Sequence, residues 1–443
     1  MSGFNKNQIY WGDYVGVIAA FVGVYTELVA RIFIYMIPER VREWFRVRII
    51  VLYHYYISSK TTDGMTDAVQ KCRNIYEICE AFGYRVEEHL VRTQDNFILC
   101  LHRITHPKQS QHKREVVYCH HGLMTNSELW VAVNESERSL PFVLIESGYD
   151  VWLGNNRGNK YSRKHITYKP KDEEFWNFSL DDMAMFDIPD TVDYILRETG
   201  REKLNYIGFS QGTAQAMAAL SINPDLNDKV NIFIGLAPAY APKGFSNYFV
   251  DYIVKVNPKI MYHLFGRRCL LPSVTFWQNI CYPPIFVKIV DVSLKILFNW
   301  DLSNISLNQK LCGYAHLYSF SSVKSVVHWL QIIKNCTFQL YDDDMALLAG
   351  YGSRHYQVPL FPTNNIKCPM LILWGGKDTL INMEVMRTAL PPHAKEVSIA
   401  HYEHLDFLWG QDVKEEVFPV VIDALKHHSL GKAKHFVKQN GFH

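Results

Sequence analysis

The stretch Gly208-Phe209-Ser210-Gln211-Gly212 decides how this chain folds, because it joins an apolar run to a helical pattern. The residues from Leu204 to Ile207 are typical of a buried strand, and the small residues after Ser210 predict a helix. A glycine-serine-glycine turn between a strand and a helix is typical of a nucleophile elbow, whose strained backbone exposes the serine. The pattern therefore predicts an α/β fold with Ser210 as a nucleophile.

A serine hydroxyl needs a base and a group that orients the base, and in an elbow-bearing fold both follow the serine in the order acid, then histidine. Asp378 follows the apolar run 370–374 through a glycine turn, and His404 follows a second strand-like run, 397–400. We therefore expect His404 to act as general base and then acid. Asp378 is expected to hold the imidazole in the productive tautomer.

Two neighbours compete for these roles. His401 lies three residues before His404 on the same predicted loop, and Asp406 lies two residues after it. We favour His404 because it directly precedes a helix entry that would fix its direction. A capping role suits Asp406 better, since a residue two positions away has difficulty reaching the far ring nitrogen.

Backbone N–H groups that face the developing oxyanion are expected from Leu123 and Gln211. Leu123 ends the segment Tyr118-Cys119-His120-His121-Gly122-Leu123, in which the glycine permits a turn, and Gln211 directly follows the nucleophile. The same segment is also compatible with a plain strand-ending turn that carries two structural histidines. A histidine pair can indicate metal, but no third ligand stands at a suitable spacing, so we expect no zinc site there.

With these segments in view, the chain resembles the acid lipase family of α/β-hydrolases, from about residue 75 to about residue 422. The resemblance implies a Ser210, Asp378 and His404 triad, oxyanion donors at Leu123 and Gln211, and no metal or organic cofactor. The matching segments, in chain order, are Gly83-Tyr84, Glu87-Glu88-His89-Leu90-Val91, Asp95-Asn96-Phe97-Ile98-Leu99, His120-His121-Gly122-Leu123, Gly148-Tyr149-Asp150-Val151-Trp152-Leu153-Gly154-Asn155-Asn156-Arg157-Gly158-Asn159, Ser162-Arg163-Lys164-His165, Phe175-Trp176-Asn177-Phe178-Ser179, Asp187-Ile188-Pro189, the elbow, Leu236-Ala237-Pro238, Gly375-Gly376-Lys377-Asp378 and His404-Leu405-Asp406-Phe407.

Length and composition fit one large α/β domain with an insertion, because 443 residues of which 48% are apolar can bury a full core. Alternating strand and helix signals run from about Phe97 to Ala237 and resume at Pro369, which is too long an interruption for an ordinary loop. We expect an α/β-hydrolase core over 70–239 and 368–428, with a mostly parallel sheet flanked by helices. An aromatic, helical cap or lid is expected over 240–367 and a basic tail over 429–443.

The N-terminal region, 1–60, is expected to anchor the protein in a membrane. Residues 14–37 are almost wholly apolar apart from Glu27 and Arg31, and a spanning helix needs about 20 such residues. The charged pair also permits a helix in the membrane interface or a re-entrant hairpin, because a second apolar run follows at 49–57. We find no small-residue cleavage site, so a retained anchor is favoured over a removable signal peptide.

Arginines that follow the first apolar run predict a catalytic domain that faces the cytosol. Nine cysteines without a dense framework agree with reduced thiols, and Cys269 and Cys281 differ in spacing from the disulfide of secreted relatives. Four glycosylation sequons, at Asn134, Asn177, Asn304 and Asn335, favour a lumenal orientation instead. The net charge of +2 argues against a nucleic-acid partner.

Together these features predict a membrane-associated serine ester hydrolase at the endoplasmic reticulum or a lipid-droplet surface. Its expected substrates are neutral lipid esters, with sterol esters first and triacylglycerols second. One alternative is an acyltransferase with the same triad. Another is a membrane-tethered scaffold that keeps the fold without turnover, because fold does not determine function.

Overall fold

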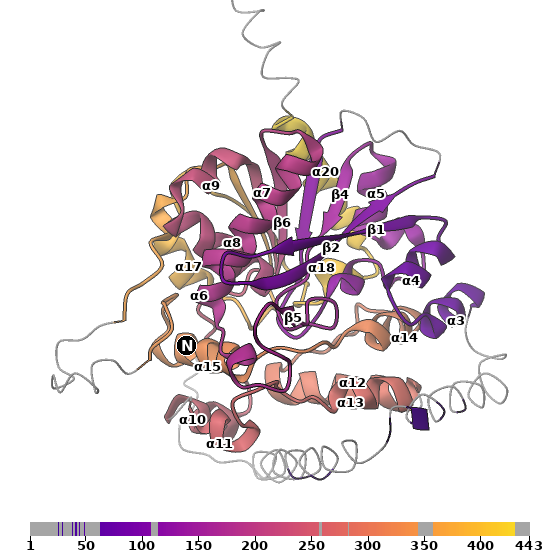
Figure 1. Cartoon of the computed structure of the whole chain (residues 1–443), viewed down its shortest axis with the longest axis vertical. Helices are drawn as coiled ribbons and strands as arrows, with labels where there is room; N and C mark the ends of the chain where they lie inside the picture. The colour runs from indigo at the N-terminus through magenta and orange to yellow at the C-terminus, as the bar shows by residue number, and fades with distance from the viewer. Residues whose placement is uncertain are drawn as a thin grey trace, which may run out of the picture.

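A mixed β-sheet with helices on both faces forms the body of the molecule (Figure 1). The computed structural model describes residues 63–107, 114–256, 259–281, 283–343 and 358–429, together with the single positions 25, 29, 38, 40, 41, 44 and 48. Within these residues, nine strands pair in the order β1-β2-β4-β3-β6-β7-β8-β9, and β5 pairs with β2. The strands are β1 (Arg85–Arg92), β2 (Phe97–Thr105), β3 (Val116–His120), β4 (Asp150–Leu153), β5 (Lys164–His165), β6 (Leu204–Phe209), β7 (Val230–Leu236), β8 (Met370–Gly375) and β9 (Lys395–Ile399).

The strands of the sheet are parallel over most of its width and antiparallel at one edge. Strands β4, β3, β6, β7, β8 and β9 run parallel, whereas β1 and β2 pair antiparallel at one edge. The central strands β3 and β6 are buried at every position, as expected for parallel strands covered on both faces. Because side chains alternate across a strand, Tyr206 enters one core layer and Ile207 the other.

Helices from both halves of the chain cover the two faces of the sheet (Figure 1). Residues of α7 and α8 fill one core layer, and residues of α5, α18 and α20 fill the other. The helices outside the insertion are α3 (Gly64–Lys71), α4 (Ile75–Ala81), α5 (Leu140–Glu146), α6 (Leu180–Asp182), α7 (Ile188–Thr199), α8 (Gln211–Ile222), α9 (Pro224–Lys229), α17 (Met383–Ala389), α18 (Asp406–Trp409), α19 (Val413–Glu416) and α20 (Phe418–His427).

A helical insertion separates β7 from β8 and packs below the sheet in the view of Figure 1. Its helices are α10 (Tyr248–Val256), α11 (Ile260–Phe265), α12 (Val274–Ile280), α13 (Pro283–Phe298), α14 (Leu307–His316) and α15 (Val323–Asn335). We call residues 240–367 the insertion. A buried network fastens α14 to the core, because His316 contacts Glu128 at 3.1 Å and the carbonyl of Val69 at 2.9 Å. Lys160 also pairs with Glu128, at 2.5 Å.

The predicted α/β architecture, with a mostly parallel sheet flanked by helices, is confirmed. Most of the predicted anchor region, 1–60, lies outside the described residues, as does the basic tail after residue 429. Among the helices that the structure describes, none is long and apolar enough to cross a bilayer. The nine cysteines, which all lie in described segments, are free thiols, and Cys269 and Cys281 form no disulfide.

Candidate active site

Ser210 lies at the carboxyl end of β6, in the tight turn that leads into α8. Its backbone has φ 55° and ψ −118°, a conformation that residues with a side chain rarely adopt. The strained turn is held on both sides, because Ser210 N–H donates to the carbonyl of Leu236 at 3.0 Å and Ser210 O accepts from Thr213 N at 3.0 Å. These backbone hydrogen bonds therefore hold the serine in the strained turn.

Glycines on either side of Ser210 are required by the packing of the elbow. A Cβ atom at Gly212 would lie 2.3 Å from the carbonyl oxygen of His120, and a Cβ at Gly208 would lie 2.7 Å from Thr213 N. Both contacts are with backbone, which cannot move aside as a flexible side chain can. The glycines thus let α8 approach β3 and β6 closely, as the sequence pattern requires.

Asp378 and His404 meet across two neighbouring loops. His404 Nδ1 lies 2.7 Å from Asp378 Oδ2, and both side chains are buried. Asp378 Oδ1 also accepts from Leu380 N at 2.9 Å, so the carboxylate is held in two directions. In this arrangement Nδ1 carries the proton, which leaves the Nε2 lone pair free to accept one.

The loops can approach because β8 ends in a glycine and a second glycine follows it. A Cβ at Gly375 would lie 2.3 Å from the carbonyl oxygen of Tyr402, and a Cβ at Gly376 would lie 2.5 Å from that of Ala400. Lys377 N donates to Tyr402 O at 3.0 Å. The Gly375-Gly376-Lys377 turn therefore brings Asp378 into register with the loop that carries His404.

The two competing residues face elsewhere. His401 is half exposed, and its Nε2 lies 2.7 Å from Asp412 Oδ2. Asp406 accepts from Glu403 N at 2.7 Å, which makes it a loop-fixing residue. The structure thus brings His404, and not His401, to Asp378.

The insertion also holds His404, through contacts that could not be predicted from sequence. The ring of Trp300 stacks on the imidazole with centroids 5.3 Å apart and planes 12° from parallel. Its indole N–H donates to Thr379 Oγ1 at 3.2 Å, next to Asp378. Glu403, directly before His404, accepts from the backbone N–H groups of Asp301 and Leu302 at 2.7 Å and 2.8 Å.

The serine and the imidazole are neighbours on the same edge of the sheet. Phe209, directly before Ser210, packs against the His404 ring with centroids 5.1 Å apart. Among the hydrogen bonds of the described residues, none joins Ser210 Oγ to His404. Catalytic hydrogen bonds are often long without substrate, so this separation is compatible with a nucleophile and its base.

The turn before Leu123 and the first residue of α8, which carry the predicted oxyanion donors, both adjoin Ser210. A Cβ at Gly122 would lie 3.4 Å from Ser210 Oγ, so the turn that carries Leu123 runs directly beside the hydroxyl. Gln211 is the first residue of α8, where backbone N–H groups lack an intrahelical partner. Its side chain is fixed, because Trp329 Nε1 donates to Gln211 Oε1 at 2.7 Å.

The histidine pair before Gly122 is engaged in hydrogen bonds. His120 contacts Tyr118 OH at 2.6 Å through Nδ1 and Asn156 Oδ1 at 2.8 Å through Nε2. His121 Nδ1 lies 2.8 Å from the carbonyl of Gly122, and its Nε2 accepts from Asn156 N at 3.1 Å. Burial lowers the pKa of His120 to about 4, so the ring is neutral. These rings support the turn that carries Leu123.

Comparison with known proteins identifies the family. A model described as a partial alpha/beta-hydrolase lipase region matches residues 75–134, and an alpha/beta hydrolase fold model matches residues 115–279. A Schizosaccharomyces pombe protein named "Probable lipase C1672.09" is 50% identical over 82% of this chain and 79% of its own length. The chain belongs to the acid lipase family of α/β-hydrolases.

More distant acid lipases extend the match. Gastric triacylglycerol lipase of Rattus norvegicus is 33% identical over 80% of this chain and 91% of its own length. Lysosomal acid lipase/cholesteryl ester hydrolase of Macaca fascicularis is 31% identical, covering 86% and 98%. A solved structure from Sulfolobus solfataricus shares the fold, with a TM-score of 0.53 at 14% identity over 78% of this chain and 94% of that one. The chain is therefore a lipase, a carboxylic ester hydrolase.

Proposed function

We propose that this lipase hydrolyses neutral lipid esters, sterol esters first and triacylglycerols second, through a Ser210, His404 and Asp378 triad. One observation carries the triad: the buried 2.7 Å contact of His404 Nδ1 with Asp378 Oδ2, beside a serine held at φ 55°. Ser210 is buried, at 8% exposure, where the sequence predicted an exposed serine. A positioned serine hydroxyl with an oriented base is the combination that nucleophilic ester cleavage requires.

The reaction follows from these positions. Ser210 Oγ attacks the ester carbonyl while His404 Nε2 takes its proton, and Asp378 stabilises the imidazolium that forms. The N–H groups of Leu123 and Gln211 bind the oxyanion. The imidazolium returns the proton to the leaving sterol or glycerol oxygen as the ester bond breaks. Water then attacks the acyl-enzyme by the same route and frees the fatty acid.

Apolar side chains on the insertion support action at a lipid surface. Ile285, Ile289 and Val292 are exposed on α13, spaced by four and three residues and so on one face of that helix. Tyr248 and Tyr252 are exposed on α10 with the same four-residue spacing. Exposed apolar surface of this kind marks an interaction site. The names of the gastric and lysosomal relatives support the two substrate classes.

A fluorophosphonate probe tests the nucleophile. We expect covalent labelling of Ser210 in the full chain, and we expect Ser210→Ala to abolish both labelling and hydrolysis of cholesteryl oleate and triolein. The loss in kcat should be about 10⁴-fold or more, because the nucleophile and its base act as a unit. Labelling confined to another residue, or turnover retained in the variant, overturns the triad.

Acyl transfer is the second reaction that this geometry permits, since an alcohol can replace water in the second half-reaction. Product analysis with labelled triolein and added free sterol separates the two. We expect free fatty acid as the product. Accumulation of sterol ester that depends on Ser210 would reassign the enzyme as a transferase.

The proposed membrane attachment and cytosolic orientation are tested on the full chain in cells. We expect the protein to resist carbonate extraction and to carry no glycan at Asn134 or Asn304. Release of the protein into the carbonate supernatant would contradict the membrane anchor. An electrophoretic shift after endoglycosidase treatment contradicts the cytosolic orientation.

A further inference from the structure

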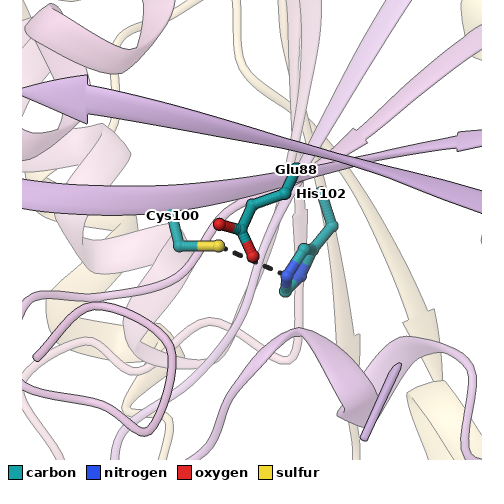
Figure 2. Close-up of side chains that lie close together, drawn as sticks. All are labelled: Glu88, Cys100 and His102. Atoms are coloured by element: carbon teal, nitrogen blue, oxygen red, sulfur yellow. Dashed lines mark hydrogen bonds between the residues drawn. The ribbon is translucent and has the colours of Figure 1, made fainter. Parts of the chain in front are cut away.

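Three potential metal ligands gather on one face of the antiparallel β1–β2 pair, at the edge of the sheet (Figure 2). Glu88 on β1 is directly opposite His102 on β2, and Cys100 lies two residues before His102 on the same strand. Residues two apart on a strand share a face, and directly opposed residues of a pair share it too. The ladder itself therefore brings a carboxylate, a thiol and an imidazole together.

The spacing of the three donor atoms suits a single small cation. The atoms all lie within 4.8 Å of one another, and Cys100 Sγ is 3.3 Å from His102 Nε2. Two ligands on a tetrahedral zinc ion, with Zn–S of about 2.3 Å and Zn–N of about 2.0 Å, are separated by about 3.5 Å. The distance between the sulfur and the nitrogen therefore matches that between two ligands of one zinc ion.

Neighbouring groups hold the ligands as outer-shell partners of a metal site do. His102 Nδ1 lies 2.8 Å from Ser127 Oγ and 3.2 Å from Asn155 Nδ2, and these two groups fix the ring with Nε2 turned toward Cys100. Tyr76 OH donates to Glu88 Oε2 at 2.5 Å, which orients the carboxylate. Metal-binding histidines and carboxylates are characteristically fixed in this way.

The surroundings favour a structural cation over a reactive thiol. Cys100 and His102 are buried, and the rings of Tyr76 and Tyr161 meet the imidazole edge-on at 5.6 Å and 4.6 Å between centroids. A soft sulfur ligand also excludes Mg²⁺ and Ca²⁺, which take oxygen ligands.

We propose that Glu88, Cys100 and His102 bind one thiophilic divalent cation, Zn²⁺, which clamps β1 to β2. The thiol proton passes to solvent as the sulfur–zinc bond forms, and solvent occupies the fourth position. The site lies on the β1–β2 edge, and β4 and β3 separate it in the sheet from β6, which leads to Ser210. The cation is therefore a clamp on the fold and takes no part in ester cleavage.

The test uses the metal-free, detergent-solubilised full chain, titrated with Zn²⁺ and with Co²⁺. We expect one equivalent of Zn²⁺ to bind and to raise the unfolding temperature. Co²⁺ should give a near-ultraviolet charge-transfer absorption from its bond to sulfur. Glu88→Gln should weaken zinc binding by at least about tenfold, and Cys100→Ser should remove the cobalt absorption. Ser127→Ala should weaken binding about tenfold to a hundredfold, as outer-shell losses do.

Matched controls separate this site from adventitious binding by other thiols. Cys336→Ser removes an exposed cysteine, and Glu87→Gln changes the neighbouring residue of β1, which pairs with Arg103. Both should bind zinc as the unaltered chain does. Equal affinity in Glu88→Gln, or a cobalt absorption that persists in Cys100→Ser, overturns the proposal. If Cys100→Ser does not fold, Glu88→Gln decides, because Glu88 is exposed.

Discussion

The turn that carries Ser210 and the loop that carries His404 are held in place by different parts of the molecule. The turn depends on core backbone, through the Ser210 hydrogen bond to Leu236 and the close approach of Gly212 to His120. The loop depends on the insertion, because Trp300 stacks on the imidazole and other insertion residues bond to Glu403.

Within one active site, the turn that carries Ser210 is therefore rigid, whereas the loop that carries His404 can adjust. The backbone of the nucleophile is held by strands and a helix of the core, and the insertion reaches this turn only through the side chain of the next residue, where Trp329 donates to Gln211. A base held by insertion residues changes its geometry whenever those residues move. Contact of the insertion with lipid would therefore act on His404 first. Each substitution below alters one side of this comparison.

Gly212→Ala alters the turn that carries Ser210 and should have the largest effect. The new Cβ would lie 2.3 Å from the His120 carbonyl oxygen, so α8 must move away from β3. We expect destabilisation of about 3 kcal/mol, as overpacking in a core costs, and loss of measurable turnover because the serine shifts with the helix. Thermal unfolding and an ester assay measure both.

Gly64→Ala is the matched control, because a Cβ at Gly64 meets no atom within 4 Å. It should leave both stability and activity close to those of the unaltered chain. Wild-type turnover in Gly212→Ala would show that the elbow tolerates displacement, and would remove the contrast between a rigid turn and an adjustable loop.

Glu403→Gln alters the contact between the His404 loop and the insertion and should have the next largest effect. Its carboxylate accepts from Asp301 N and Leu302 N, and charge-assisted bonds of this kind contribute about 1.5 to 3 kcal/mol. We expect the His404 loop to shift and kcat to fall by about a hundredfold, as small misplacements in active sites do. Fluorophosphonate labelling rates report the same loss.

The control is Glu384→Gln. Glu384 is highly exposed, and the substitution removes only its ion pair with Lys243, in which Nζ lies 3.8 Å from Oε2. It should be neutral. If Glu403→Gln retains full kcat while the protein stays folded, the insertion does not set the geometry of the base.

The elbow, with the strand before it and the helix after it, could be predicted from sequence because its signals lie close together in the chain. Gly208 and Gly212 flank Ser210 in the printed sequence, and the continuous apolar run before them indicates a strand buried on both faces. His404 could be placed ahead of His401 from the helix entry that follows it, and the structure shows His404, not His401, contacting Asp378.

Trp300 and Glu403 could not be predicted, because their roles arise from contacts across about a hundred residues of sequence. A tryptophan in an aromatic segment looks like any core residue until the fold places its ring on the imidazole. The cluster of Glu88, Cys100 and His102 could not be predicted for the same reason. Glu88 is twelve residues from Cys100, and only the pairing of β1 with β2 brings them together.

Trp300→Leu should have a smaller effect than Glu403→Gln. The leucine removes the aromatic face over the imidazole, which stabilises the imidazolium formed during catalysis, and such contacts contribute about 1 to 2 kcal/mol. That corresponds to a loss of about five- to thirtyfold in kcat. Steady-state kinetics should show the loss in kcat with KM little changed.

Trp300→Phe separates stacking from hydrogen bonding, since it keeps a ring and loses only the N–H that reaches Thr379. It should recover most of the activity that the leucine loses. A phenylalanine variant as impaired as the leucine variant would assign the role to the hydrogen bond, and a rise in KM alone would point to substrate contact.

His401→Ala should have the smallest effect and sharpens the comparison within the loop itself. His401 is half exposed and pairs with Asp412, and exposed ion pairs contribute at most about 1 kcal/mol. We expect activity within about twofold of the unaltered chain, whereas His404→Ala should lose about 10⁴-fold or more. The two histidines stand three residues apart, so the pair of substitutions holds the loop nearly constant and changes only which ring is lost. Equal losses in both variants would mean that the loop as a whole, and not the His404 contact with Asp378, determines turnover.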